Sequence, residues 1–390
     1  MNRLVARSMG EVRPDLLPDP QRGGRARVLF LTIDIMGFRT LAEHLEWATQ
    51  SRDDIEAVHV RLQLPTWAKV LGKAVPKISK SGWDFCSYRH MLLWRNVLRG
   101  LFRTRLPLER FDVVHITTQG NGLVGADFAG PGSPKFVVQI DATGLGEVAE
   151  FGFSRTARAP FVAAEKRIFD AAASVACWSR WAADSVRRDY GVPAERVCVA
   201  KPAIRIPEIA REHASHEGRV RLAIVGNNWV RKGGDRLLRW HQQRWKDRAE
   251  LHVFGANIEP VAGAANVTWH GHTARETLLT RILPTMDVMV IPTRQDTLLL
   301  AALEASACGL PVVSTRQAGL SDVVVEGETG FLCASNDESA YVGAVERLMG
   351  DPALRRRMGE AGRAFVASEW DPARCYGEQL DRLCALAKSR

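Results

Sequence analysis

The stretch of sequence that decides the fold is residues 287–333, DVMVIPTRQDTLLLAALEASACGLPVVSTRQAGLSDVVVEGETGFLC. It opens with a short apolar run, Val288–Ile291, that ends at a proline, as buried strands often do. A helical pattern over 298–307 ends at Gly309, and a second apolar run, 311–314, follows directly. A strand, a helix and a strand in succession predict a βαβ unit of a parallel sheet.

Apolar runs of the same kind recur along both halves of the chain. The first half contains 27–33, 55–60, 112–116, 136–140 and 174–178. The second half contains 219–225, 251–254, 267–269, Val288–Ile291, 311–314 and Gly330–Cys333. Because helical patterns lie between them, we predict an α/β fold of two Rossmann-like domains, each with a parallel sheet. Ligands of such sheets lie outside the carboxyl ends of the strands, so we expect the site in a central cleft across which the two sheets face.

The length of the chain supports two domains, because 390 residues exceed what one hydrophobic core usually serves. We expect a flexible leader over 1–25, which is rich in proline and glycine and lacks the apolar segment of a secretory signal. The N-terminal domain is predicted over 26–208 and the C-terminal domain over 209–369. The linker is expected within 201–217, which is rich in proline, histidine and charged residues.

The net charge of +9 is distributed unevenly along the chain. Residues 67–105 carry nine lysines and arginines against one acidic residue, Asp84, and are interleaved with tryptophan, phenylalanine and leucine. Such a block can lie on an anionic membrane surface or bind nucleic acid. It can also be the solvated face of a helix whose apolar residues are core. We expect no nucleic-acid partner and keep peripheral membrane contact through 67–105 as an open alternative.

Cysteine usage and hydropathy indicate a cytoplasmic protein. The seven cysteines are scattered without a CxxC pair, which is typical of reduced thiols. No run of 18 or more apolar residues is present, so no transmembrane helix is expected. No D-x-D loop and no Cys/His cluster points to a metal site.

Two carboxylates in the 287–333 stretch carry the first functional hypothesis. Asp296 lies in the loop before the predicted helix, and Glu304 lies eight residues later inside it. Free N–H groups at the start of a helix suit a diphosphate. A carboxylate roughly 10 Å further along the axis can accept hydrogen bonds from ribose hydroxyls. The competing interpretation is that Asp296 is a helix N-cap and Glu304 a surface residue.

Two cations in a second stretch carry the next hypothesis. Residues 225–235 read VGNNWVRKGGD, a strand end, a loop and a helix start. Lys232 and Arg231 are placed to stabilise the negative charge that a diphosphate leaving group gathers as its bond breaks. The competing interpretation is a solvated basic turn.

These stretches together resemble the family 4 retaining glycosyltransferases of the group 1 type. The D-x7-E spacing is similar to the E-x7-E motif of that family, and 303–313 (LEASACGLPVV), 318–324 (AGLSDVV) and 327–332 (GETGFL) resemble its flanking sequence. The similarity covers about 110–380 and is strongest over 220–365. It implies a GT-B fold in which a C-terminal helix, 370–390, packs back on the N-terminal domain.

The resemblance also implies an activity. Members transfer a sugar from a nucleoside diphosphate sugar, here a UDP- or GDP-sugar, with retention at the anomeric carbon. They need no metal and no cofactor beyond the donor substrate. Their acceptors are glycans, lipid-linked glycans or small molecules.

The resemblance assigns donor-side roles residue by residue. Asp296 is implied to hold the transferred sugar, Glu304 the ribose, and Lys232 and Arg231 the diphosphate. The remaining implied contacts are Asn227, which stands where the family has an arginine, the backbone of Leu299 and Leu300 at the phosphates, and the segments around Gly255 and His270 at the base.

Three candidates lie at strand ends of the N-terminal domain. Gly37 can let backbone approach the diphosphate or the acceptor. His115 ends the run DVVHI, where many members of the family carry H-x-H and a histidine contacts the transferred sugar; Thr117 occupies the second position here. A lone strand-end histidine is more often structural. Asp141 directly follows the apolar run 136–140 and is therefore also a strand-end candidate.

The chain departs from the family pattern at three points: the first motif carboxylate is Asp296, leucines replace glycines over 298–300, and Asn227 replaces an arginine. These differences favour an altered donor, but they also fit a catalytically silent GT-B protein that binds a nucleotide sugar or a partner enzyme. A sugar-nucleotide epimerase shares the fold. An NAD-dependent oxidoreductase is disfavoured, because no G-x-G-x-x-G follows a predicted strand.

Overall fold

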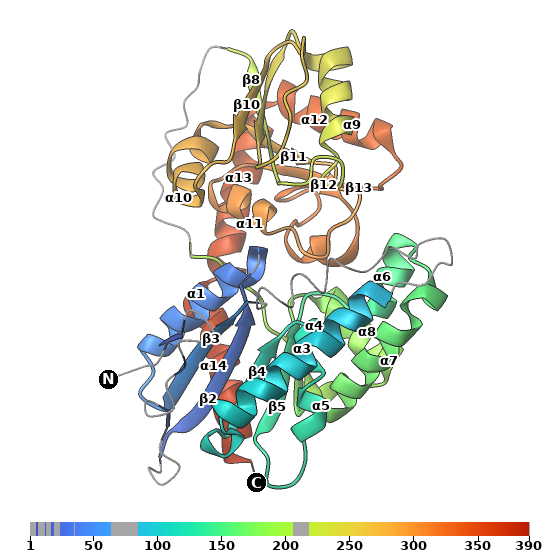
Figure 1. The fold of residues 1–390 in the computed structure, drawn as a ribbon. Coiled ribbons are helices and arrows are strands. Elements are labelled where there is room, and N and C mark those ends of the chain that lie inside the picture. The colour runs from blue at the N-terminus through green and yellow to red at the C-terminus, as the bar shows by residue number, and fades with distance from the viewer. Residues whose placement is uncertain are drawn as a thin grey trace. The chain divides into compact units, whose positions relative to one another are not determined.

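The computed structural model describes residues 5–6, 12, 17–18, 24–34, 36–63, 85–205 and 218–389 (Figure 1). The chain divides into two compact units. Unit 1 comprises Met1–Ala203 with Pro372–Arg390, and unit 2 comprises Ile204–Asp371. The division falls five residues before the predicted boundary at 208, and the last helix belongs to unit 1.

Unit 1 is built on a seven-stranded parallel sheet of order β1-β3-β2-β4-β5-β6-β7. Its strands are β1 (Val5–Ala6), β2 (Ala26–Ile33), β3 (Ile55–Leu62), β4 (Val113–Thr117), β5 (Lys135–Ile140), β6 (Ser174–Cys177) and β7 (Val197–Val199). The central strands are almost wholly apolar and buried, as parallel strands covered on both faces must be. The short β7 is the one strand of this sheet besides β1 that the apolar pattern did not predict.

Helices cover both faces of this sheet. In the view of Figure 1, α3 crosses in front of the strands and α14 lies behind them. The helix α14 packs on α1 and β2, whereas α3, α4 and α7 pack on one another. The helices of unit 1 are α1 (Met36–Gln50), α3 (Phe85–Thr104), α4 (Gln119–Gly122), α5 (Gly125–Phe128), α6 (Gly144–Phe151), α7 (Arg155–Ala171), α8 (Arg180–Tyr190) and α14 (Pro372–Lys388), with 3₁₀ turns at Leu108–Arg110 and Ala194–Arg196.

Unit 2 is built on a six-stranded parallel sheet of order β10-β9-β8-β11-β12-β13. Its strands are β8 (Val220–Val225), β9 (Ala249–Phe254), β10 (Val267–Gly271), β11 (Val288–Ile291), β12 (Val312–Thr315) and β13 (Gly330–Cys333). In this order the chain runs outward from β8 to β10 and then returns to the other side of β8 with β11. The order therefore reverses between β8 and β11, as in the doubly wound dinucleotide-binding fold.

The helices of unit 2 alternate with these strands. They are α9 (Gly234–Trp240), α10 (Arg275–Thr277), α11 (Leu300–Ala307), α12 (Glu338–Gly350) and α13 (Pro352–Glu369). Single π-helical turns follow α9 (His241–Trp245) and α10 (Leu278–Ile282), and 3₁₀ turns cover Leu283–Thr285 and Ala318–Asp322. The α/β fold class and the two parallel sheets predicted from the sequence are confirmed.

A few residues of the predicted flexible leader, 1–25, lie within the described part of the chain. Val5 and Ala6 pair in parallel with His59 and Val60 of β3, which extends the sheet by one short strand. Val12 is 3% exposed. The pairing is possible because the edge strand β3 offers an open row of backbone hydrogen-bonding groups that a short segment can cover.

The described part of the basic block, 85–105, is a helix with an apolar core face. Met91, Trp94 and Leu98 of α3 are at most 1% exposed. Arg95 makes two hydrogen bonds to the carboxylate of Asp127, at 2.6 and 2.7 Å. For these three residues the structure agrees with the solvated-face interpretation, since their side chains belong to the core. The rest of the block, 67–84, lies outside the described residues. No helix that the structure describes is long and apolar enough to cross a membrane.

Candidate functional site

The reversal of strand order in unit 2 brings two predicted site segments together. β8 leads into the loop 226–233, and β11 leads into the loop 292–299. These strands are neighbours in the sheet, with Met289 opposite Ala223. Because both strands are parallel, both loops leave the same edge, at the switch point where α/β sheets bind their ligands.

A buried ion pair joins the two loops. The ammonium of Lys232 donates a hydrogen bond to Asp296 Oδ2, and these side chains are 12% and 11% exposed. Arg231 Nη1 lies 3.8 Å from the same oxygen. Burial lowers the pKa of Lys232, and the neighbouring carboxylate of Asp296 opposes that shift. Two cations and one carboxylate of the predicted diphosphate and sugar site therefore meet at one point.

Further contacts hold the two loops in register. Arg294 makes a bidentate ion pair with Asp235, at 2.6 and 2.7 Å. Arg231 Nη1 donates to the carbonyl of Gln295 at 2.7 Å. Gly233 has a φ of 75°, and a Cβ there would lie 2.0 Å from the carbonyl oxygen of Pro292. Only glycine permits this close approach of the two backbones.

The second motif carboxylate has a different partner. Glu304 lies within α11, and its Oε1 accepts a hydrogen bond from Arg275 Nε at 2.7 Å. Its side chain is 13% exposed. Burial raises the pKa of Glu304, and Arg275 opposes that shift. Sequence reasoning missed Arg275, because nothing in a 29-residue separation indicates the contact.

Two of the three leucines at 298–300 face inward. Leu298 and Leu299 are 6% and 1% exposed, so their side chains belong to the core of unit 2. The N–H of Leu300 donates to the carbonyl of Leu298 at 3.2 Å. The helix α11 begins at Leu300, two residues after the predicted start.

The predicted base-side residues Gly255 and His270, and Asn227 of the predicted diphosphate site, lie at the ends of three neighbouring strands. Asn227 Oδ1 accepts from the N–H of Ala256 at 2.8 Å, which ties the end of β8 to the end of β9. Gly255 is required there, since a Cβ would lie 2.3 Å from the carbonyl oxygen of Gly226. The ring of His270 stacks on Phe254, with 4.3 Å between ring centroids. The side chain of Asn227 thus links the ends of β8 and β9 and is not part of the cluster of Lys232 and Asp296.

The predicted histidine of unit 1 is part of the core. His115 lies within β4 and is 0% exposed. Its Nε2 lies 3.2 Å from Gln379 Nε2 of α14, and burial lowers its pKa to about 4. This position favours a packing role, because the ring faces a helix instead of the strand end. Gly37 lies in the first turn of α1, and the half-buried Asp141 directly follows β5.

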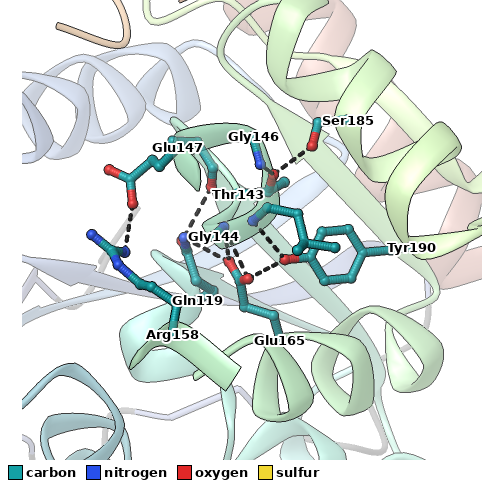
Figure 2. Close-up of polar contacts among 11 residues, drawn as sticks. Gln119, Thr143, Gly144, Gly146, Glu147, Arg158, Glu165, Ser185 and Tyr190 are labelled. Atoms are coloured by element: carbon teal, nitrogen blue, oxygen red, sulfur yellow. Dashed lines mark hydrogen bonds and ion pairs between the residues drawn. The ribbon is translucent and has the colours of Figure 1, made fainter. Parts of the chain in front are cut away.

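A buried polar network orders the loop that follows Asp141 (Figure 2). Glu165 of α7 is 0% exposed, and both its oxygens accept from the N–H of Gly144, at 2.9 and 3.0 Å. Gln119 Nε2 donates to Oε1 at 3.1 Å, and the hydroxyl of Tyr190 donates to Oε2. Burial raises the pKa of Glu165 to about 8. One carboxylate thereby joins the loops after β4 and β5.

No group of three or more His, Cys, Asp or Glu residues that could hold a metal ion occurs among the described residues.

Two family models match the chain. A model of the glycosyl transferases group 1 matches residues 219–351, and a model of a glycosyl transferase 4-like domain matches residues 21–203. Each match lies in one of the two structural units. Together they cover both sheets and both sets of strand-end loops described above.

Relatives by sequence carry related descriptions. A D-inositol 3-phosphate glycosyltransferase of Pseudarthrobacter chlorophenolicus is 26% identical, over 66% of this chain and 67% of that protein. A protein of the same name from Paenarthrobacter aurescens is 29% identical, over 52% of this chain and 55% of that protein. A glycogen synthase of Mycobacterium tuberculosis is 36% identical over 101 residues, 26% of this chain and 24% of that protein. The alignments thus span between a quarter and two thirds of these relatives.

Solved structures share the fold at low identity. A sucrose-phosphate synthase from Thermosynechococcus elongatus has a TM-score of 0.71 at 18% identity, covering 93% of this chain and all of that one. Anabaena HepE, solved with UDP and glucose, has a TM-score of 0.65 at 16% identity, with coverage of 93% and 100%. The family models on both units, together with these similarities of fold, show that the chain belongs to the group 1 glycosyltransferases of GT-B fold.

Proposed function

We propose that this protein transfers a sugar from a UDP- or GDP-sugar to a hydroxyl-bearing acceptor, with retention at the anomeric carbon and without a metal or other cofactor. The observation that carries the proposal is the meeting of Lys232, Arg231 and Asp296 at the switch point of unit 2. Glu304, eight residues after Asp296, lies within the helix that starts beside them.

In this proposal Lys232 has two successive partners. In the structure its ammonium is paired with Asp296. A diphosphate entering the site competes for the same ammonium, and Arg231 adds a second positive charge. As the bond to the leaving diphosphate breaks, charge accumulates on its oxygens, and fixed cations stabilise that charge without reorganising. A metal ion is then not needed for this step.

The carboxylates would act on the sugars of the donor. Once the diphosphate has engaged Lys232, Asp296 can accept hydrogen bonds from hydroxyls of the transferred sugar and stabilise positive charge near the anomeric carbon. Glu304 can accept from the ribose hydroxyls. The buried setting strengthens both interactions, because the local dielectric is low.

The acceptor is proposed to be a small molecule or a glycan. The relatives described as D-inositol 3-phosphate glycosyltransferases support a small polyol acceptor, and the one described as glycogen synthase supports a glycan. A screen of inositol phosphates, monosaccharides and glycan primers with radiolabelled UDP- and GDP-sugars would separate these classes.

The test of the activity is substitution of the two charged groups. Lys232→Ala should lower the rate of sugar transfer by about a hundredfold or more, because a fixed cation in a buried site is worth several kcal/mol in the transition state. Glu304→Ala should mainly raise the KM for the donor. Arg281→Ala, an exposed arginine of unit 2, is the control and should behave as wild type. Wild-type turnover in the Lys232 variant would refute the proposal.

A catalytically silent nucleotide-sugar-binding protein is the second candidate. It is favoured by one observation: the N–H of Leu300 is engaged by Leu298, so the loop offers one backbone donor fewer to a phosphate. Calorimetry with UDP- and GDP-sugars, combined with an assay for released nucleotide, distinguishes the two. Binding without turnover over the whole acceptor screen would support the silent protein.

A further inference from the structure

Glu304 has a single strong partner, and that partner comes from outside the 287–333 motif. Arg275 belongs to α10, a short helical turn that precedes β11 in the sequence. Its Nε donates to Glu304 Oε1 at 2.7 Å. Within the described part of the chain no protein group donates to Oε2, so this oxygen keeps its capacity to accept from a ligand.

The position of Arg275 is set by the segment that follows it. Leu278 and Leu279 are 6% and 1% exposed and anchor the π-helical turn in the core of unit 2. The N–H of Leu278 donates to the carbonyl of Ala274 at 2.9 Å, which closes the turn around Arg275. Cys308 Sγ lies 3.5 Å from the carbonyl of Leu279, which joins this segment to the end of α11. The backbone of Arg275 is therefore fixed relative to the helix that carries Glu304.

We propose that Arg275 is a positioning residue of the donor site: its hydrogen bond to Oε1 orients the Glu304 carboxylate so that Oε2 accepts hydrogen bonds from the ribose of the nucleotide. The inference rests on the proposed function, because it assigns Glu304 to the ribose. It adds a residue that lies outside the motif and a specificity for ribonucleotides over deoxyribonucleotides.

Charge and burial give the physical reason. Burial raises the pKa of Glu304, and Arg275 is the one charged side chain among the described residues that opposes this rise. An ionised carboxylate only accepts hydrogen bonds, whereas a protonated one uses one oxygen as a donor. Without Arg275 the carboxyl group would hold its proton to higher pH and would present a poorer acceptor to the two ribose hydroxyls.

A purely structural ion pair would behave differently. Arg275 is 39% exposed, and exposed ion pairs contribute only about 0–1 kcal/mol to stability. Loss of such a pair would shift the unfolding temperature slightly and leave nucleotide binding unchanged. The discriminating measurement is therefore the preference for ribose together with its dependence on pH.

The experiment measures the Kd of UDP, GDP and their 2′-deoxy counterparts by calorimetry, at pH 6 and pH 8. The proteins are wild type, Arg275→Ala, Arg275→Lys and the control Arg281→Ala, each checked for its thermal transition. We expect Arg275→Ala to weaken binding of the ribonucleotide about tenfold at pH 6 and less at pH 8. The deoxynucleotide should be affected less, Arg275→Lys should restore part of the affinity, and Arg281→Ala should match wild type.

The outcomes separate this inference from the proposed function. Ribonucleotide binding by Arg275→Ala that equals wild type, or an equal loss for ribose and deoxyribose at both pH values, would overturn the role of Arg275 and leave the proposed function standing. If wild type binds none of the four nucleotides, the proposed function fails and this inference fails with it. If Arg275→Ala does not fold, Arg275→Lys decides the matter by the same ribose comparison.

Discussion

At the scale of single residues, one strained backbone position lies next to the proposed donor site of unit 2. Ala318 has a φ of 43°, in the left-handed region that residues with a Cβ rarely adopt. The residue after it, Gly319, donates its N–H to the carbonyl of Thr297 at 3.0 Å. The strained backbone therefore supports the loop that carries Asp296.

We predict that Ala318→Gly stabilises the protein. Glycine adopts a positive φ without the steric cost of about 1 kcal/mol or more that a Cβ imposes, and it loses part of this gain to unfolded-state entropy. The net gain should be roughly 0.5 kcal/mol. Urea unfolding at constant pH measures it, with Ala344→Gly within α12 as the matched control.

The control should move in the opposite direction. Glycine within a helix costs about 1 kcal/mol relative to alanine, so Ala344→Gly should be less stable than wild type. Equal destabilisation by the two substitutions would contradict the assignment of strain to Ala318.

At the scale of elements, helix α7 holds a buried carboxylate that orders two strand-end loops of unit 1. Gly144 has no room for a side chain, since a Cβ there would lie 2.7 Å from Glu165 Oε2. Thr143 caps α6 by accepting from the N–H of Gly146 at 2.9 Å. Figure 2 shows Gln119 of α4, Gly144 of α6 and Tyr190 of α8 converging on the carboxylate of Glu165.

We predict that Glu165 makes the stability of unit 1 fall as the pH rises. In the folded protein burial raises its pKa to about 8, above the ordinary value of 4.5. Between these values the folded state binds a proton that the unfolded state has released. The stabilisation is complete below about pH 4.5 and is lost progressively toward pH 8, by an amount on the order of a few kcal/mol.

Glu165→Gln tests this prediction, because glutamine keeps the shape of the side chain and removes its titration. Free energies of unfolding at pH 5, 6.5 and 8 should show a smaller decline for the variant than for wild type. Glu150→Gln, an exposed acidic residue of α6, serves as the control and should follow the wild-type profile. Parallel profiles for wild type and Glu165→Gln would contradict the raised pKa.

At the scale of the whole molecule, the chain crosses from unit 1 to unit 2 near Ile204 and returns after Asp371. The returning helix α14 is part of the core of unit 1. Tyr376 donates its hydroxyl hydrogen to the carbonyl of Ala203 at 2.8 Å, and Leu383 is 2% exposed. The stability of unit 1 therefore depends on the last residues of the chain.

We predict that Leu383→Ala destabilises unit 1 selectively. Removing a buried leucine side chain costs about 2–5 kcal/mol, because apolar contacts are lost and a cavity is left. Unit 2 has its own sheet and core, so its nucleotide affinity, measured by calorimetry, should be retained. Lys388→Ala, near the exposed end of α14, should change neither quantity. If Leu383→Ala lost nucleotide binding together with the stability of unit 1, the two units would not fold as separate cores.

Much of this architecture could be predicted from the sequence, because it depends on local signals. Short apolar runs bounded by glycine and proline located most strands to within two residues. The 287–333 stretch indicated a βαβ unit and a nucleotide-sugar site, and the family models bear out the resemblance. The short edge strand β1 was missed because two residues carry no periodic pattern.

The partners of the charged residues could not be predicted in this way. The sequence by itself determined the element types, the two α/β units and the spacing of Asp296 and Glu304, since these follow from hydrophobic periodicity and turn residues close together in the chain. Only the tertiary structure decided that Lys232 pairs with Asp296 across 64 residues, that Arg275 reaches Glu304, and that His115 faces α14. The physical reason is that such contacts depend on the order and register of strands, which arise from packing the whole unit and have no local signature in the chain.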